Sequence, residues 1–340
     1  MESIYYVLTW LCHRTCPHCY EDRFRPYYGA DRERVAGESR NNFARIIASF
    51  PERLSYRDRT AGDGAAEQPG TVILAGGEVL LDAVRESALY PALDLLWKRY
   101  GGKVQLVVQT TGDLVTERIV GELIDRHAAV ISVSGVDHFH AGLEEPEAQA
   151  ALRDKLTLIF ERFGMHYGGT REPAPAPRFH FFGATPDAWI GKLWPRGRAW
   201  LNGLSTADLT ENFCNRWSGG LGFLDAGSAG SEVSVDPDGN VYPCCLKTRL
   251  PVGNLLDEPL EAILRRRATD PVYQAISAGQ PQRMGLAHGW SEEMFIEKSR
   301  TVTPDGKPYA NLCIGCDRFH DEVLMPSSSS GLKVLPSPDR

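Results

Sequence analysis

Short apolar, β-rich runs alternate with amphipathic segments from the start of the chain to about residue 200. Within one amphipathic segment Phe43, Ile46, Ile47 and Phe50 recur at the spacing of a single helical face. Six apolar runs read as strands, over residues 4–11, 71–75, 103–109, 129–134, 165–169 and 178–183. The pattern therefore predicts a series of strand–helix units.

Strands that alternate with helices favour parallel βαβ units and an α/β fold. Six such units suit an open, partial (β/α)6 barrel of the TIM type. In barrels of this kind the chemistry lies at the carboxyl ends of the strands. We therefore expect the functional residues directly after the predicted strands.

The regular alternation stops near residue 205, and the chain then becomes rich in glycine, cysteine and turn residues. We expect the barrel to span residues 1–204 and a small, Cys-rich α+β module to span residues 205–325. Residues 326–340, which begin with a run of serines, are expected to be a disordered tail.

Composition narrows the class of protein. The 340 residues carry a formal net charge of −7, which gives no electrostatic footprint for nucleic acid. No apolar run is long enough to cross a bilayer, and no secretory signal is recognisable at the N-terminus. Eight cysteines without an export signal favour metal ligands in a reducing cytoplasm over disulfides.

Three of these cysteines follow the first predicted strand. Cys12, Cys16 and Cys19 are spaced C-x3-C-x2-C, so their thiolates can converge on one metal centre. A cubane [4Fe–4S] cluster normally takes four cysteines, and three would leave one iron open to an outside ligand. A zinc loop is the alternative, and it would need a fourth ligand such as His13 or His18.

The C-x3-C-x2-C loop after a first strand resembles that of the radical S-adenosylmethionine (SAM) enzymes. The resemblance extends to Gly76-Gly77-Glu78, which follows the second predicted strand. It implies a partial barrel, a [4Fe–4S] cluster with one open iron, and SAM bound to that iron. It further implies that Gly76, Gly77 and Glu78 hold the amino group of the SAM methionine.

The end of the fourth predicted strand resembles the Ser-x-Asp-Gly segment that touches the SAM ribose in this family. Ser134 stands where the family's Asp is usual, and Asp137 lies three residues later. We expect Ser132 and Ser134 to contact the ribose, with capping of the strand end as the alternative. His138 and His140 are candidate acid–base groups or partners in loop hydrogen bonds.

The resemblance implies three further contacts to SAM. His18 precedes the third cysteine, where relatives carry a residue that packs on adenine, and Tyr20 is a second stacking candidate. Arg198 is expected to grip the SAM carboxylate, because a guanidinium can bind a carboxylate bidentately. Arg196 and Lys192 are the alternatives for that role.

A second set of cysteines lies downstream. Gly239-x4-Cys244 forms a predicted hairpin, with the lone Cys214 before it and the pair Cys313 and Cys316 after it. The set resembles the ligands of an auxiliary [4Fe–4S] cluster in radical SAM enzymes with a C-terminal SPASM or shorter twitch module. Structural zinc on four cysteines is the alternative.

Cys245 remains outside both sets. As the neighbour of Cys244 it is a buried bystander, an alternative ligand or a functional thiol.

The resemblance implies that the enzyme reductively cleaves SAM to a 5′-deoxyadenosyl radical, which abstracts hydrogen from a substrate. An auxiliary cluster that accepts an electron predicts net oxidation or modification of a small molecule or natural-product precursor. Maturation of a ribosomal peptide is the alternative. Flavodoxin or ferredoxin is the expected reductant. A non-catalytic zinc or electron-transfer protein is the hypothesis from another class.

Overall fold

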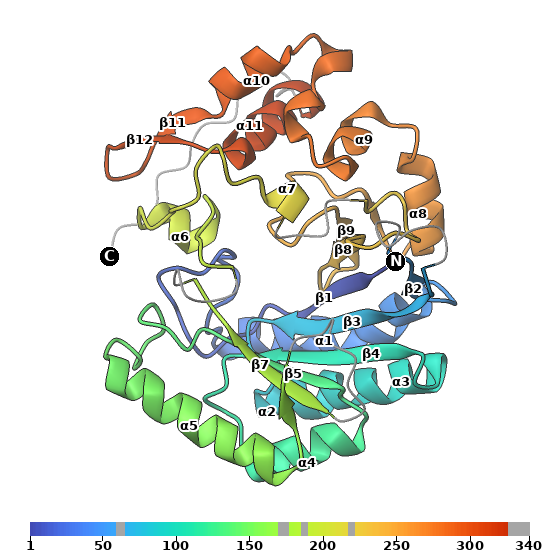
Figure 1. The fold of residues 1–340 in the computed structure, drawn as a ribbon, viewed down its shortest axis with the longest axis vertical. Helices are drawn as coiled ribbons and strands as arrows, with labels where there is room; N and C mark the ends of the chain where they lie inside the picture. The colour runs from blue at the N-terminus through green and yellow to red at the C-terminus, as the bar shows by residue number, and fades with distance from the viewer. Residues whose placement is uncertain (59–64, 169–176, 185–189, 217–221, 326–340) are drawn as a thin grey trace.

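A ten-stranded, mostly parallel sheet organises the computed structural model, which describes residues 1–58, 65–168, 177–184, 190–216 and 222–325 (Figure 1). The predicted disordered tail lies outside the described residues. The strands are β1 (Ser3–Thr9), β2 (Ser55–Tyr56), β3 (Gln68–Gly76), β4 (Val104–Thr110), β5 (Val130–Ser134), β6 (His166–Tyr167), β7 (Arg178–Phe182), β8 (Glu232–Val235), β9 (Asn240–Tyr242) and β10 (Gly253–Asn254).

Strands β1, β3, β4 and β5 are parallel neighbours in chain order, as successive βαβ units require. This arrangement confirms the predicted α/β class with a mostly parallel sheet. The last two predicted strands depart from chain order, because β7 pairs with β5 and β6 lies outside β7. Both residues of β6 are exposed, whereas β7 buries Arg178 and Phe179, which suits β7 to the inner position.

Five helices follow the strands and cover one face of the sheet (Figure 1). They are α1 (Gly29–Ala48), α2 (Asp82–Val84), α3 (Tyr90–Tyr100), α4 (Glu117–Asp125) and α5 (Pro146–Arg162), with a π-helical turn, Arg85–Leu89, between α2 and α3. The main core lies between these helices and the sheet and includes Leu8, Ile46 and Leu93.

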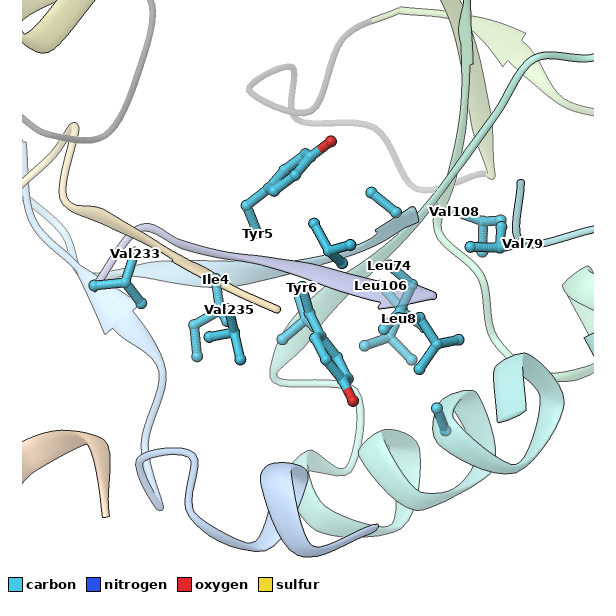
Figure 2. Close-up of a cluster of buried hydrophobic side chains, with 14 of the residues drawn as sticks. Ile4, Tyr5, Tyr6, Leu8, Leu74, Val79, Leu106, Val108, Val233 and Val235 are labelled. Atoms are coloured by element: carbon cyan, nitrogen blue, oxygen red, sulfur yellow. The ribbon is translucent and has the colours of Figure 1, made fainter. Parts of the chain in front are cut away.

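Alternate residues of β1 point to opposite faces of the sheet (Figure 2). Tyr6 points toward the helices and meets the ring of Phe50 edge-on at 6.0 Å. Tyr5 points to the other face, where its hydroxyl lies 3.2 Å from the Tyr20 hydroxyl and accepts from Gln109 at 3.3 Å. The face opposite the helices, called the inner face below, therefore carries polar groups at Tyr5 and Gln109.

The C-terminal part of the chain continues the same sheet. β8 pairs in parallel with β1, and β9 and β10 extend it antiparallel. The remaining elements are α6 (Gly197–Leu201), α7 (Phe213–Arg216), α8 (Leu260–Arg267), α9 (Pro271–Ser277), α10 (Glu292–Lys298), β11 (Arg300–Val302), β12 (Pro308–Ala310) and α11 (Leu312–Phe319), with short turns Pro281–Arg283, Leu286–His288 and His320–Leu324. The predicted boundary at residues 204 and 205 stays a prediction.

A search of the described residues finds no helix with the length and apolar character needed to span a membrane.

The two tyrosines of β1 provide a test of this packing. The Tyr6 hydroxyl is buried without a hydrogen-bond partner among the described residues. Because an unpaired buried hydroxyl costs about 1–3 kcal/mol, Tyr6→Phe should raise the free energy of unfolding by about 1 kcal/mol. Tyr5→Phe, the matched control, should lower it by about 1 kcal/mol, since its hydroxyl is bonded. Chemical denaturation measures both, and a loss of stability in Tyr6→Phe would contradict the assignment.

Candidate functional site

The first cysteine loop leaves β1 at the carboxyl edge of the sheet. The Cys12 amide donates to the Arg25 carbonyl at 3.1 Å, and the Cys19 amide donates to the Cys16 carbonyl at 3.3 Å. Cys12 and Cys16 are both only 7% exposed. These bonds fold residues 12–19 into a compact turn that holds three thiols beside the strand ends.

The electrostatics of this loop suit a metal centre. Burial raises the pKa of Cys19 to about 12 and also raises that of Cys16, and neighbouring thiolates in the set add to both shifts. The ionised form of these thiols is therefore unfavourable without a metal. Bound metal cations would relieve the repulsion between the thiolates. A soft, all-sulfur donor set fits iron–sulfur or zinc chemistry.

The two histidines of the loop are held by other elements. His13 Nε2 lies 2.6 Å from Asp113, which follows β4, and Arg14 pairs with the same carboxylate at 2.9 Å. His18 stacks on Phe139, with ring centroids 5.2 Å apart. Both imidazoles thus contact residues that follow other strands, and the zinc loop closed by histidine stays an alternative.

Gly76 and Gly77 pack against the cysteine loop itself. A Cβ on Gly77 would lie 2.3 Å from the Leu11 carbonyl oxygen, and one on Gly76 would lie 2.8 Å from the Thr9 carbonyl oxygen. Only glycine permits this approach. Their predicted contact with the SAM amino group stays a prediction.

Glu78 is a buried carboxylate held by the end of β4. Its oxygens accept from the Thr110 hydroxyl at 2.9 Å, the Thr111 amide at 2.8 Å and the Thr111 hydroxyl at 2.7 Å, and from the Leu80 amide at 2.8 Å. Burial raises the pKa of Glu78, and these hydrogen bonds oppose the rise. The carboxylate is fixed in one orientation at the same edge as the cysteine loop.

His18, Asp137 and His140 come together beyond β5. One ligand atom from each lies within 4.8 Å of the other two. Asp137 pairs with His140 at 3.0 Å and accepts from the Ala184 amide at 3.3 Å. Burial would raise the pKa of Asp137, but the bond to His140 lowers it to about 2, and burial lowers the pKa of His18 to about 4. An anionic carboxylate therefore lies beside a neutral imidazole.

The other predicted site residues of β5 and the loop after it lie in different surroundings. Ser132 pairs with His180 Nε2 at 2.8 Å on the inner face of the sheet, and the Ser134 hydroxyl donates to the Thr110 carbonyl at 3.4 Å. His138 is exposed, whereas His140 is 5% exposed. The structure thus favours His140 over His138 as a site group, and Asp137 joins it.

Tyr20 and the predicted basic residues all have protein partners. Tyr20 meets Phe24 edge-on at 5.7 Å, so one edge of the ring is already packed. Arg198 donates to the carbonyls of Cys16, Asp22 and Phe24 at 2.8, 3.1 and 2.8 Å. Lys192 pairs with Glu211 at 2.8 Å. The structure thus gives Arg198 a role in holding the cysteine loop, and a role toward a carboxylate stays a prediction.

The second cysteine set lines one cavity. Its walls include Cys214, Cys244, Cys313 and Cys316, the four cysteines predicted to act together. Cys313 and Cys316 lie one turn apart on α11, whose first turn is capped by the Asn311 side chain. Thiolates of this set raise one another's pKa, after burial as the larger cause. Four converging thiols fit a metal cluster.

Cys245 has other surroundings than Cys244. Among the described residues it is missing from the cavity lining, and its thiolate would act on Tyr5 and Tyr20 on the barrel side. Burial raises the pKa of Cys245, and Glu232 raises it further. The adjacent cysteines of the hairpin therefore point to different surroundings.

A charged cluster that the sequence analysis missed joins the two cysteine regions. Lys247 pairs with Glu21 at 2.6 Å, and Glu21 also pairs with Arg23 at 2.8 Å. The Trp10 ring lies 3.6 Å from the Arg23 guanidinium carbon and 4.2 Å from the Lys247 ammonium. Burial would raise the pKa of Glu21, but Arg23 and Lys247 lower it to about 2. The one sequence signal for these charged residues is that they lie close to Cys19 and Cys245 along the chain.

The adjacent cysteines allow a matched test of the second set. Cys244→Ser should lose about four irons per chain after anaerobic reconstitution, because a thiolate ligand is removed. Cys245→Ser should retain the full iron content, because Cys245 is not among the described residues that line the cavity. Iron analysis with visible absorption measures both variants. The reverse result would make Cys245 the ligand.

A comparison with known families bears on the C-terminal part. Residues 228–317 match the SPASM model, described as an iron–sulfur cluster-binding domain. No curated protein matches the chain.

Solved structures with some similarity have low sequence identity to the chain. BtrN in complex with AdoMet and 2-DOIA is 13% identical, with a TM-score of 0.46 over 82% of this chain and 87% of that chain. Native anSMEcpe with bound AdoMet and Cp18Cys peptide is 14% identical, with a TM-score of 0.41 over 77% and 79%. Streptococcus suis SuiB bound to S-adenosylmethionine is 12% identical, with a TM-score of 0.39 over 82% and 68%.

The SPASM match covers β8, β9 and three of the four cysteines that line the cavity described above, Cys244, Cys313 and Cys316. Residues 228–317 are therefore similar to the SPASM iron–sulfur cluster-binding domain, which agrees with the resemblance predicted for this part of the chain.

Proposed function

We propose that the protein is a radical SAM enzyme that oxidises a polar small molecule or natural-product precursor. One observation carries the proposal: three cysteines, of which Cys12 and Cys16 are buried, and a fixed carboxylate, Glu78, share the carboxyl edge of a parallel sheet that continues into a segment similar to an iron–sulfur domain. Cys12, Cys16 and Cys19 would hold the first cluster. When bound, this cluster and SAM supply a 5′-deoxyadenosyl radical that abstracts hydrogen.

The protein's own groups would position SAM. Glu78 offers a carboxylate for the SAM ammonium, and Asp137 offers one for hydroxyl groups near His18. Because Thr110 and Thr111 donate to Glu78, its orientation is set before the ligand arrives. Asp137 is likewise fixed by His140.

The substrate class follows from the inner face of the sheet. Barrel interiors are usually filled by branched apolar side chains. Here Tyr5, Gln109, Ser132 and His180 place hydroxyl, amide and imidazole groups on that face, and two hydrogen-bonded pairs join them. Polar groups on the inner face of a barrel favour a ligand that can hydrogen-bond with them. This lining supports a polar small molecule over a peptide.

The second cysteine set supports net oxidation. Cys214, Cys244, Cys313 and Cys316 would hold an auxiliary cluster whose chemistry, when bound, is one-electron transfer. Cys245 and Tyr5 lie on the barrel side of the same hairpin, so the inner face and the second set are close neighbours. A flavodoxin or ferredoxin would supply the electron to the first set.

SAM cleavage tests the proposal. Reduced, anaerobic protein should bind about eight irons and convert SAM into 5′-deoxyadenosine and methionine. Cys16→Ala should abolish the cleavage and leave about four irons, while Cys245→Ser should preserve the cleavage and about eight irons. Chromatography of the products with iron analysis gives the answer. Colourless protein with stoichiometric zinc and no 5′-deoxyadenosine would instead favour the non-catalytic alternative.

A further inference from the structure

Residues 196–198 contact both cysteine sets. Arg198 donates to the Cys16 carbonyl at 2.8 Å, as described above. Two residues earlier, Arg196 donates toward the Cys313 carbonyl at 3.5 Å. Gly197 lies between them with φ +49°, and a Cβ there would lie 2.6 Å from the Cys19 carbonyl oxygen. The segment therefore fits tightly between the two metal regions.

Arg196 is a buried cation against the second set. Its side chain is 12% exposed and forms a bidentate pair with Asp317, at 2.8 Å to Oδ2 and 3.0 Å to Oδ1. Asp317 directly follows Cys316, and Arg196 lines the cavity that the four cysteines share. Opposite charges thus lie beside the thiols, where solvent screens them weakly.

The cation acts on the thiols across this short distance. Arg196 lines the same cavity as the four thiols, and its guanidinium donates toward the carbonyl of one of them, Cys313. A group that stabilises negative charge on the ligands also stabilises it on the metal cluster that they hold.

We propose that Arg196 and Asp317 set the reduction potential of the cluster on the second cysteine set. One-electron reduction adds a negative charge to the cluster, so the guanidinium should raise the potential and the carboxylate should lower it. In the proposed function, the electron that reduces the second cluster comes from the substrate radical, which also loses a proton to solvent. The inference rests on the proposed function only for the presence of the second cluster.

Redox titration of the second cluster tests the inference. The full-length chain with Cys12, Cys16 and Cys19 replaced by alanine is the parent, so that only the second cluster gives an electron paramagnetic resonance signal. Arg196→Gln should lower the reduction potential by at least about 59 mV. At a fixed applied potential this shifts the ratio of oxidised to reduced cluster about tenfold toward the oxidised form. Asp317→Asn should shift the ratio in the opposite direction.

Arg249→Gln is the matched control. It removes the same charge 3.6 Å from Asp317, but the Arg249 side chain is 51% exposed. Solvent should reduce its effect to about threefold or less.

Two variants keep the test decisive if Arg196→Gln fails to load iron. Asp317→Asn alone must then raise the reduction potential of the second cluster. Arg196→Lys keeps the positive charge, so its reduction potential must stay close to that of the parent. Ratios of oxidised to reduced cluster within about twofold of the parent for both charge-removing variants, or shifts of both ratios in the same direction, would overturn the inference alone. A parent without iron would overturn both the inference and the proposed cluster.

Discussion

Burial of two sets of thiols beside fixed positive charge is the constraint on which the site depends. The thiols lie at the carboxyl edge of the sheet and around the cavity of the C-terminal part, where burial disfavours their anions. Arg198 holds the backbone of the first set, and Arg196 lies against the second. Metal binding relieves the cost of collecting thiolates there, so folding and metal loading are expected to be coupled.

The same constraint explains how the two parts of the chain are joined. β8 continues the sheet from β1, and the buried pair of Glu21 and Lys247 links the loop after Cys19 to the hairpin that carries Cys244. Trp10 lies against the charges of Arg23 and Lys247. Removing one partner of such a pair leaves an uncompensated buried charge, which makes the joint specific. The spacing between the two cysteine sets is therefore fixed by packing, not by a flexible linker.

Much of this arrangement could be predicted from the sequence, because local spacing carries it. The strand runs, the C-x3-C-x2-C loop and the Gly-x4-Cys hairpin are short-range patterns, and they predicted the sheet and both cysteine sets. Long-range partners have no such signal. The pairing of Asp317 with Arg196 spans 121 positions, and the edge position of β6 depends on competition between two strands for one neighbour. Arg198 matched a local motif, yet its hydrogen bonds go to the cysteine loop.

The central claim is that the first cluster keeps one iron open for SAM. Electron paramagnetic resonance of dithionite-reduced protein, recorded with and without SAM, tests it most directly. A [4Fe–4S] signal whose g values change when SAM is added, and which is lost in Cys12→Ala, is the expected result. A signal that SAM leaves unchanged would contradict an open coordination position and the function built on it.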